Sequence, residues 1–205
     1  DDTDVEATNA ESLKSFDSDG FTVGTMNEVN TNTESFVSLN WKGGTTSGIA
    51  TDGSTTITPS AYSFNQTAGI SIIEYTGNAV SGAKLAHGLG TTPAMVIVKN
   101  LQTTASWMIY HQYSNAVPED YGLQLDTVAA AGDNADLWND TAPDSVNVTL
   151  GSADANGSGN SLIGYCFADV QGYSKFGGYT GNGNADGTFV YTGFAVAYLL
   201  IKRVD

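Results

Sequence analysis

The chain has 205 residues, of which 40% are hydrophobic and only 14% are charged, enough for one sizeable core or two small ones. Its 22 acidic residues outnumber its 7 basic residues, and the net charge of −15 argues against nucleic acid and anionic membrane surfaces, because both need clustered Lys and Arg. Gly is abundant, and Ser, Thr and Asn fill the segments between apolar runs, which indicates short strands joined by turns rather than helices. The composition therefore predicts an all-β protein.

The N-terminal residues 1–10 are acidic and small and show no hydrophobic period, so a disordered start is expected. They do not resemble a signal peptide, and no apolar run reaches the length of about eighteen residues that a membrane span needs. No membrane insertion is therefore expected. Cys166 lies in the apolar stretch SLIGYCFADV and is expected to be a small buried side chain.

Apolar and polar residues alternate in many short segments, which predicts half-buried strands. The predicted strands span residues 21–25, 34–41, 71–77, 94–99, 106–113, 121–127, 146–151, 161–167, 188–194 and 195–202. Residues 43–60 have almost no apolar content, which is typical of a long loop. The only stretch that tolerates a helix is 127–138.

Several of these segments occur twice. YTGN begins at Tyr75 and again at Tyr179, and each copy precedes an apolar run ending in lysine, AMVIVK and then AYLLIK. SVNVTLG likewise matches the earlier SDGFTVG, and NSLIGYCF matches ESFVSLNW. Such repetition predicts an all-β protein built from repeated units. The predicted divisions are a C-terminal half-unit at 11–44, a linker or long loop at 45–68, a complete unit at 69–170, and the N-terminal half of a further unit at 171–205.

These motifs, with HGLG at 87–90 and WNDTAP at 138–143, resemble a repeated β domain of uncharacterised function in large virion proteins of marine tailed bacteriophages. The resemblance covers the chain from Phe16 onward and includes tail-fibre and tail-tip proteins. It implies an antiparallel β-sandwich of the jelly-roll or concanavalin type, located in the virion, and it implies no catalytic residues. One departure is YTGF at 191–194, where a second HGLG would fall.

Aromatic residues provide the candidate binding site. Trp138 lies in the polar segment DLWNDTAP and is the best candidate for a surface ring that stacks on a sugar, although it could instead pack under its own loop. Tyr110 and His111, at the end of the segment SWMIYHQY, complete the candidate set.

Oxygen-rich loops provide candidate calcium ligands, because calcium takes six to eight oxygens from carboxylates, amides and carbonyls. Asp17 and Asp19 precede a glycine in one such loop, and Asp154 and Asn156 lie in another. None completes the twelve-residue pattern of an EF-hand. Asp, Asn and Gly also form plain β-turns, which the sequence favours.

Three functions are consistent with the sequence. The first is a non-enzymatic virion module in a tail fibre or other appendage, with copies of itself, neighbouring virion proteins or a bacterial surface glycan as partners. The second is a lectin-like carbohydrate-binding adhesin, which predicts a dependence on calcium or sugar. The third is a depolymerase of surface glycans, which would need a carboxylate pair that the sequence does not reveal. Repetition favours the first. Because each outer half-unit would leave strand edges open, the two are expected to pair within the chain or between chains.

Overall fold

A computed structural model describes residues 3–205 and divides the chain into two compact units, a small one at Glu6–Trp41 and a larger one that contains Lys42–Asp205. Strands dominate, and the helical elements are the α-helices α1 (Asn27–Asn30) and α2 (Ala135–Trp138) and the 3-10 helix η1 (Pro118–Asp120). The all-β class is therefore confirmed. Within residues 3–205, no helix has the length and apolar character that crossing a bilayer requires.

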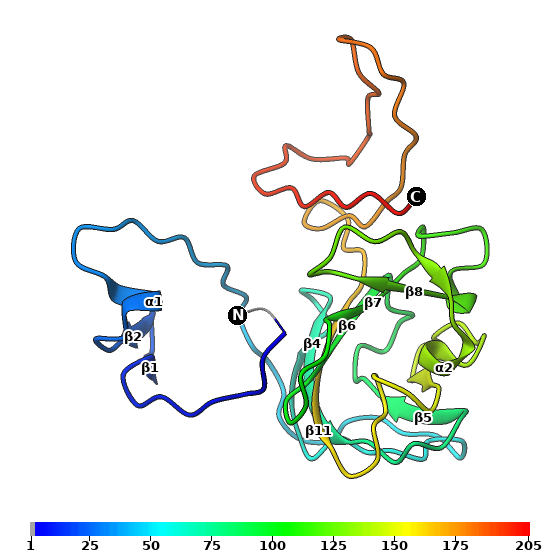
Figure 1. Cartoon of the computed structure of the whole chain (residues 1–205), viewed down its shortest axis with the longest axis horizontal. Helices are drawn as coiled ribbons and strands as arrows, with labels where there is room; N and C mark the ends of the chain where they lie inside the picture. Colours follow the sequence, from blue (N-terminus) through cyan, green and yellow to red (C-terminus); the bar gives the residue numbers. More distant parts are fainter. Residues whose placement is uncertain (1–2) are drawn as a thin grey trace. The chain divides into compact units, whose positions relative to one another are not determined.

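The larger unit is built on a seven-stranded antiparallel sheet (Figure 1). In spatial order, its strands are β3 (Ala61–Asn65), β4 (Ile70–Thr76), β11 (Ser161–Phe167), β6 (Met95–Asn100), β7 (Met108–His111), β8 (Tyr121–Gln124) and β9 (Gly132–Asp133). β11 pairs with β4 along its whole length and with β6 over nearly all of it. The motif segments SIIEYT and AMVIVK therefore flank the same strand.

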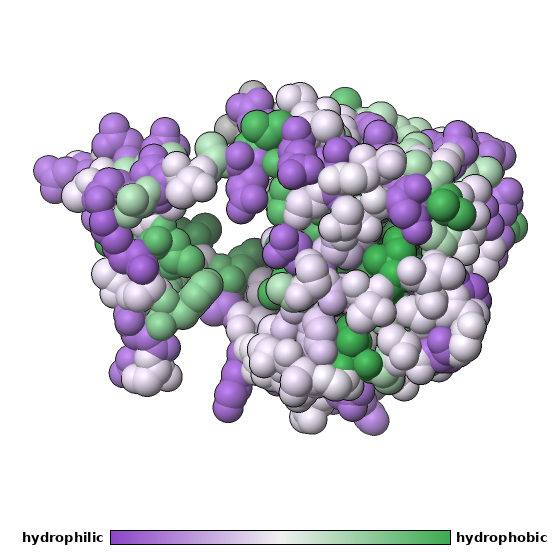
Figure 2. All heavy atoms as spheres, turned by 90° about the horizontal axis from the view of Figure 1, so that it is seen from below, coloured by the Kyte–Doolittle hydropathy of each residue, from purple (hydrophilic) through white to green (hydrophobic). Residues whose placement is uncertain are grey.

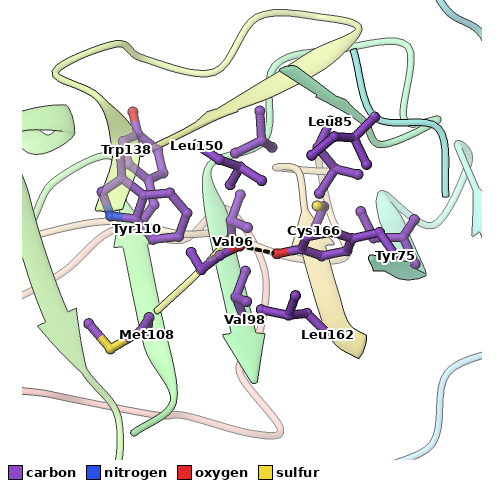
Figure 3. Close-up of a cluster of buried hydrophobic side chains, with 14 of the residues drawn as sticks. Tyr75, Leu85, Val96, Val98, Met108, Tyr110, Trp138, Leu150, Leu162 and Cys166 are labelled. Atoms are coloured by element: carbon purple, nitrogen blue, oxygen red, sulfur yellow. Dashed lines mark hydrogen bonds between the residues drawn. The ribbon is translucent and has the colours of Figure 1, made fainter. Parts of the chain in front are cut away.

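A second layer covers one face of this sheet and makes the unit a sandwich. It contains the antiparallel pair β5 (Ala83–Ala86) and β10 (Asn147–Leu150), together with α2 (Figure 1). Side chains of β11 are buried alternately, with Leu162 and Cys166 inside, as expected for a strand with one face on the core. Figure 3 shows the sulfur of Cys166 pointing toward Leu85 of the second layer. The narrower jelly-roll or concanavalin assignment remains a prediction.

The small unit consists of a β-hairpin, β1 (Leu13–Phe16) and β2 (Phe21–Val23), followed by α1. Large apolar side chains of the hairpin, those of Leu13, Phe16 and Phe21, are exposed. The side chains of Phe36, Val37 and Leu39, which follow the hairpin, are also exposed. Apolar atoms accordingly lie on the surface of this unit in the space-filling view (Figure 2). This unit as it stands has little core of its own.

Some predicted boundaries differ from the structure. β3 lies within residues 45–68, where a linker or long loop was expected, and Tyr62 and Phe64 of β3 stack with ring centroids 6.0 Å apart. The predicted strands at 34–41, 188–194 and 195–202 are wrong for this structure, because a strand needs a hydrogen-bonded neighbour and these described segments have no such ladder.

The expectation of a disordered start concerns residues 1–10, of which residues 1–2 lie outside the described part of the chain. The next residue is held in place, because the backbone oxygen of Thr3 accepts hydrogen bonds from Ala105 N at 3.1 Å and from Lys99 Nζ at 3.1 Å. Residues 5–9 have no regular secondary structure.

Candidate functional site

The first YTGN motif lies at the end of β4 and binds the loop that precedes β11. The Tyr75 side chain is fully buried, and its hydroxyl donates a hydrogen bond of 2.6 Å to the backbone oxygen of Ala155 in that loop (Figure 3). Burial raises the pKa of Tyr75 above its usual value. The phenol therefore stays protonated and serves as a donor.

Asn156 is the polar centre of this contact, and its side chain is 0% exposed. Its Oδ1 accepts from the backbone N–H of Asn78 at 2.9 Å, and its Nδ2 donates to Asn78 Oδ1 at 3.1 Å. Nδ2 also donates to the backbone oxygens of Val80 at 3.2 Å and Gly151 at 2.8 Å. A buried amide with both ends bonded is what the low-dielectric interior requires.

The glycine of YTGN is needed for a close backbone approach. Gly77 N donates to Asn160 O at 3.0 Å, and Gly77 O accepts from Gly159 N at 2.9 Å. A Cβ at Gly77 would lie 2.3 Å from the backbone oxygen of Gly157. We call these contacts of Tyr75–Asn78 with residues 155–160 the YTGN junction. Sequence reasoning did not identify it as a site, although the repetition of YTGN was its signal.

The candidate calcium ligands are not brought together. Asp17 and Asp19 lie in the β1–β2 turn, where the carboxylate of Asp17 accepts from Ser15 Oγ at 2.9 Å and Thr22 Oγ1 at 2.8 Å. Asp154 lies exposed in the other loop, beside the fully bonded Asn156. Within residues 3–205, no three His, Cys, Asp or Glu side chains are placed to hold a metal ion.

The candidate aromatic residues are brought together, but in the core. Trp138 of α2 is 1% exposed and meets Tyr110 of β7 edge to face, with ring centroids 6.1 Å apart. This is the packed alternative for Trp138, and neither ring offers a face to solvent. His111 is half-buried, and its Nδ1 accepts from Tyr113 N at 3.1 Å. Burial lowers the pKa of His111, and the charge of Asp169 opposes that shift.

His87 of the HGLG motif is buried, and its side chain stabilises a turn. Its Nδ1 accepts from Leu89 N at 3.2 Å, and its Nε2 lies 3.2 Å from the backbone oxygen of Asp144, so Nε2 carries the hydrogen. Burial lowers the pKa of His87, which the contact with Asp144 partly offsets. With both ring nitrogens bonded to backbone groups, His87 holds the β5 end against the loop before β10.

Carboxylates approach one another at one place that the sequence analysis did not identify. Partial burial and then the charges of Asp140, Glu119 and Asp133 raise the pKa of Asp120 in η1. A glycosidase would need two such groups across a cleft. The hollow of about 220 Å³ beside β8 includes one of these acids, Asp133, in its lining.

A larger hollow of about 470 Å³ lies between the loop after β8 and the C-terminal segment. It is lined by Leu125, Thr127, Val128, Leu200, Ile201, Lys202 and Arg203. This lining contains two cations and no carboxylate. Neither hollow therefore contains the paired acids of a glycosidase.

Comparison with known proteins gives a family but no functional relative. No curated protein and no solved structure matches the chain. A family model described as a domain of unknown function, DUF7483, matches residues 1–205. The chain therefore belongs to the DUF7483 family.

Proposed function

We propose that the chain is a non-enzymatic structural module of a bacteriophage virion, part of a tail fibre or another surface appendage, that contributes to assembly or host recognition. The resemblance of the YTGN, HGLG and WNDTAP segments to phage virion domains supports the location. The observation that carries the structural role is the YTGN junction, whose side chains are used entirely on internal hydrogen bonds.

The same holds for the other motif side chains. His87 of HGLG bonds two backbone groups, and Trp138 of WNDTAP is a core residue packed against Tyr110. A catalytic or sugar-binding set would instead direct several of its polar groups into a solvent-accessible pocket. The segments that carry the resemblance are thus explained by folding.

The partners that fit this proposal are other copies of the chain, neighbouring virion proteins and, for host recognition, a bacterial surface glycan. The net charge of −15 makes nucleic acid an unsuitable partner, because phosphate contacts require cationic side chains. A glycan carries no such requirement. Recognition of a neutral surface sugar is therefore compatible with an acidic surface.

Mass spectrometry of washed particles of a phage that encodes this chain tests the location. We expect the chain to remain with the particles, and immunogold labelling should place it on an appendage. A chain that is abundant in the lysate but lost from washed particles would overturn the proposal. Incubation of the purified chain with envelopes of marine bacteria tests the non-enzymatic part, because release of reducing sugar would contradict it.

The same incubation with and without a calcium chelator examines recognition. Binding that the chelator abolishes would favour a calcium-dependent adhesin over a purely structural module. Asp17→Ala and Asp154→Ala variants would then show which of the two loops holds the ion.

A further inference from the structure

The small unit contains the same hydrogen-bond pattern that surrounds α2 in the larger unit. Asn134 Oδ1 accepts from Asp136 N at 3.1 Å, and Asn9 Oδ1 accepts from Glu11 N at 2.8 Å. In both places the residue directly after the motif glycine donates a hydrogen bond from its hydroxyl to the acid. Ser152 Oγ donates to Asp136 at 3.1 Å, and Thr25 Oγ1 donates to Glu11 at 2.9 Å. The two segments therefore have one local structure.

The glycines that end the two matching strands also correspond. Gly151 N donates to Leu137 O at 2.7 Å, and Gly24 N donates to Ser12 O at 2.7 Å. A Cβ would meet a backbone oxygen at 2.1 Å at Gly151 and at 2.4 Å at Gly24. The match between SVNVTLG and SDGFTVG is thus accompanied by equal backbone geometry.

The correspondence extends to the asparagine of the YTGN junction. Asn156 Nδ2 donates to Gly151 O at 2.8 Å, and Asn30 Nδ2 donates to Gly24 O at 2.8 Å. Asn156 uses its remaining capacity on Asn78 of YTGN. The hydrogen bonds described for Asn30 give it no such YTGN contact. The small unit therefore contains one half of a second junction.

The other half is present at the C-terminal side of the chain. The second YTGN begins at Tyr179, which is 51% exposed. The run AYLLIK that follows it corresponds to β6, and its Leu199 and Ile201 match the buried Val96 and Val98, yet both are exposed. These residues have the sequence of core strands without a core.

The segment that would lie between them is residues 34–41 of the small unit. It matches β11, which separates β4 from β6. Its Phe36 matches Leu162 of β11, which is 0% exposed, yet Phe36 is 50% exposed. Pairing of 34–41 with 173–180 on one side and 197–202 on the other would bury all three segments.

The anchoring of these segments favours a partner in another chain. At the β3 edge, Asn65 Nδ2 donates to Lys42 O at 3.3 Å. This bond anchors the residue that directly follows the segment 34–41. Beyond β8, Lys202 Nζ donates to Thr127 O at 2.6 Å, so the C-terminal segment lies near the β9 edge. With strands about 4.8 Å apart, these edges of the seven-stranded sheet are about 29 Å apart. Closure within one chain would break an anchor, whereas a second copy requires neither to be released.

We propose that residues 9–41 of one copy and residues 173–202 of the next copy complete a second sandwich, so that chains associate head to tail. In this contact the Tyr179 hydroxyl donates to the backbone oxygen of Val29, as the Tyr75 hydroxyl donates to Ala155 within the chain. Asn30 binds Asn182, as Asn156 binds Asn78. Such a contact is heterologous and propagates into a filament. The inference names a partner for the proposed virion module and rests on that proposal for its biological setting alone.

Sedimentation of the chain of 205 residues over a range of concentrations tests the contact. We expect the average mass to rise above the 21.3 kDa of one chain as concentration increases. Phe36→Lys and Leu199→Lys should each weaken association at least tenfold, because these residues match the buried Leu162 and Val96 and each change places a cation on the buried strand face. Val80→Lys is the matched control, since Val80 is also exposed and lies outside the interacting segments, and it should associate as the unaltered chain does.

Mixing the two impaired variants tests the head-to-tail geometry. Each variant keeps one intact surface, so an equal mixture should form a one-to-one dimer that neither variant forms alone. Tyr179→Phe, which removes only a hydroxyl, should weaken association by a smaller factor of a few fold. Far-UV circular dichroism of each variant confirms that the larger unit is folded.

Three outcomes would overturn the inference: an unaltered chain that stays monomeric at every soluble concentration, association that Phe36→Lys and Leu199→Lys leave unchanged, or a mixture that fails to dimerise. A monomer in which both segments resist proteolysis would indicate closure within one chain. These results leave the proposed function standing, because that proposal is tested by the presence of the chain in washed particles.

Discussion

Replacing Asn156 by alanine should destabilise the larger unit strongly, because this buried side chain accepts one hydrogen bond at Oδ1 and shares its two Nδ2 hydrogens among three acceptors. A typical intramolecular hydrogen bond contributes about 1 kcal/mol net, and a buried partner that loses its bond costs about as much or more. Three such bonds, one at Oδ1 and one for each Nδ2 hydrogen, give a loss of about 3 kcal/mol in the free energy of unfolding. For a chain of this size, each kcal/mol lowers Tm by about 2–4 °C.

Urea denaturation followed by tryptophan fluorescence and far-UV circular dichroism measures this loss. Asn115→Ala is the matched control, because Asn115 is exposed and its side chain accepts one hydrogen bond, from its neighbour Ala116 N at 2.6 Å. The control should change the free energy of unfolding by less than about 0.5 kcal/mol.

Asn156→Asp separates hydrogen bonding from the filling of space. The aspartate has nearly the same volume, but it lacks the Nδ2 donor and would place a carboxylate against the backbone oxygens of Val80 and Gly151. At neutral pH this variant should lose at least as much stability as Asn156→Ala. A loss below about 1 kcal/mol for both variants would refute the reasoning that the YTGN junction holds the two layers together.

Three further predictions concern other buried positions. Burial raises the pKa of Cys166 to about 12, so a thiol reagent at pH 8 should leave the native chain unmodified and react only on unfolding; rapid native reaction would contradict the core assignment. The pKa of His87 is lowered by burial, so the folded state holds fewer protons, and the urea midpoint should fall as pH drops below the unfolded value of about 6.5; a His87→Asn variant should show a smaller fall between pH 7.5 and pH 5.5, and an identical fall would assign the effect elsewhere. Gly77→Ala would press a Cβ to 2.3 Å from Gly157 O and should lower the free energy of unfolding by more than about 2 kcal/mol, whereas Gly132→Ala, with open space around it, should change it little.

The fold class could be predicted from the sequence because it depends on local signals. Alternating apolar residues and Gly-rich turns indicated β6, β10 and β11 without knowledge of their neighbours. β3 was missed because its two aromatic residues, Tyr62 and Phe64, stand in a segment otherwise rich in Ser, Thr and Gly. Its place in the sheet depends on β4, which is a tertiary effect that local composition does not report.

The candidate site was harder to predict for the same reason. Nothing local separates a Trp138 that packs on Tyr110 from one that faces solvent, because the distinction depends on where α2 lies. The sequence predicted Asn156 as a candidate calcium ligand, but its hydrogen-bond partner Asn78 lies 78 residues away in the sequence. Only the repetition of YTGN indicated that this segment has a defined role.

The strands predicted at 34–41 and 195–202 show a further limit. Their apolar pattern is that of core strands, but a pattern specifies only the tendency of a segment, and a ladder also needs a neighbour. In the larger unit that neighbour is supplied by the same chain. For these two segments, we infer that another copy supplies it.

Hydrogen exchange at the second YTGN tests the account most directly. In the first copy of the motif, the backbone N–H groups of Gly77, Asn78 and Ala79 are all hydrogen-bonded across the junction. If the second copy forms the same junction, the corresponding amides of residues 181–183 should become protected as the concentration of the chain rises, and Phe36→Lys should abolish that protection. Rapid exchange at 181–183 under conditions where the chain is fully associated would contradict the account.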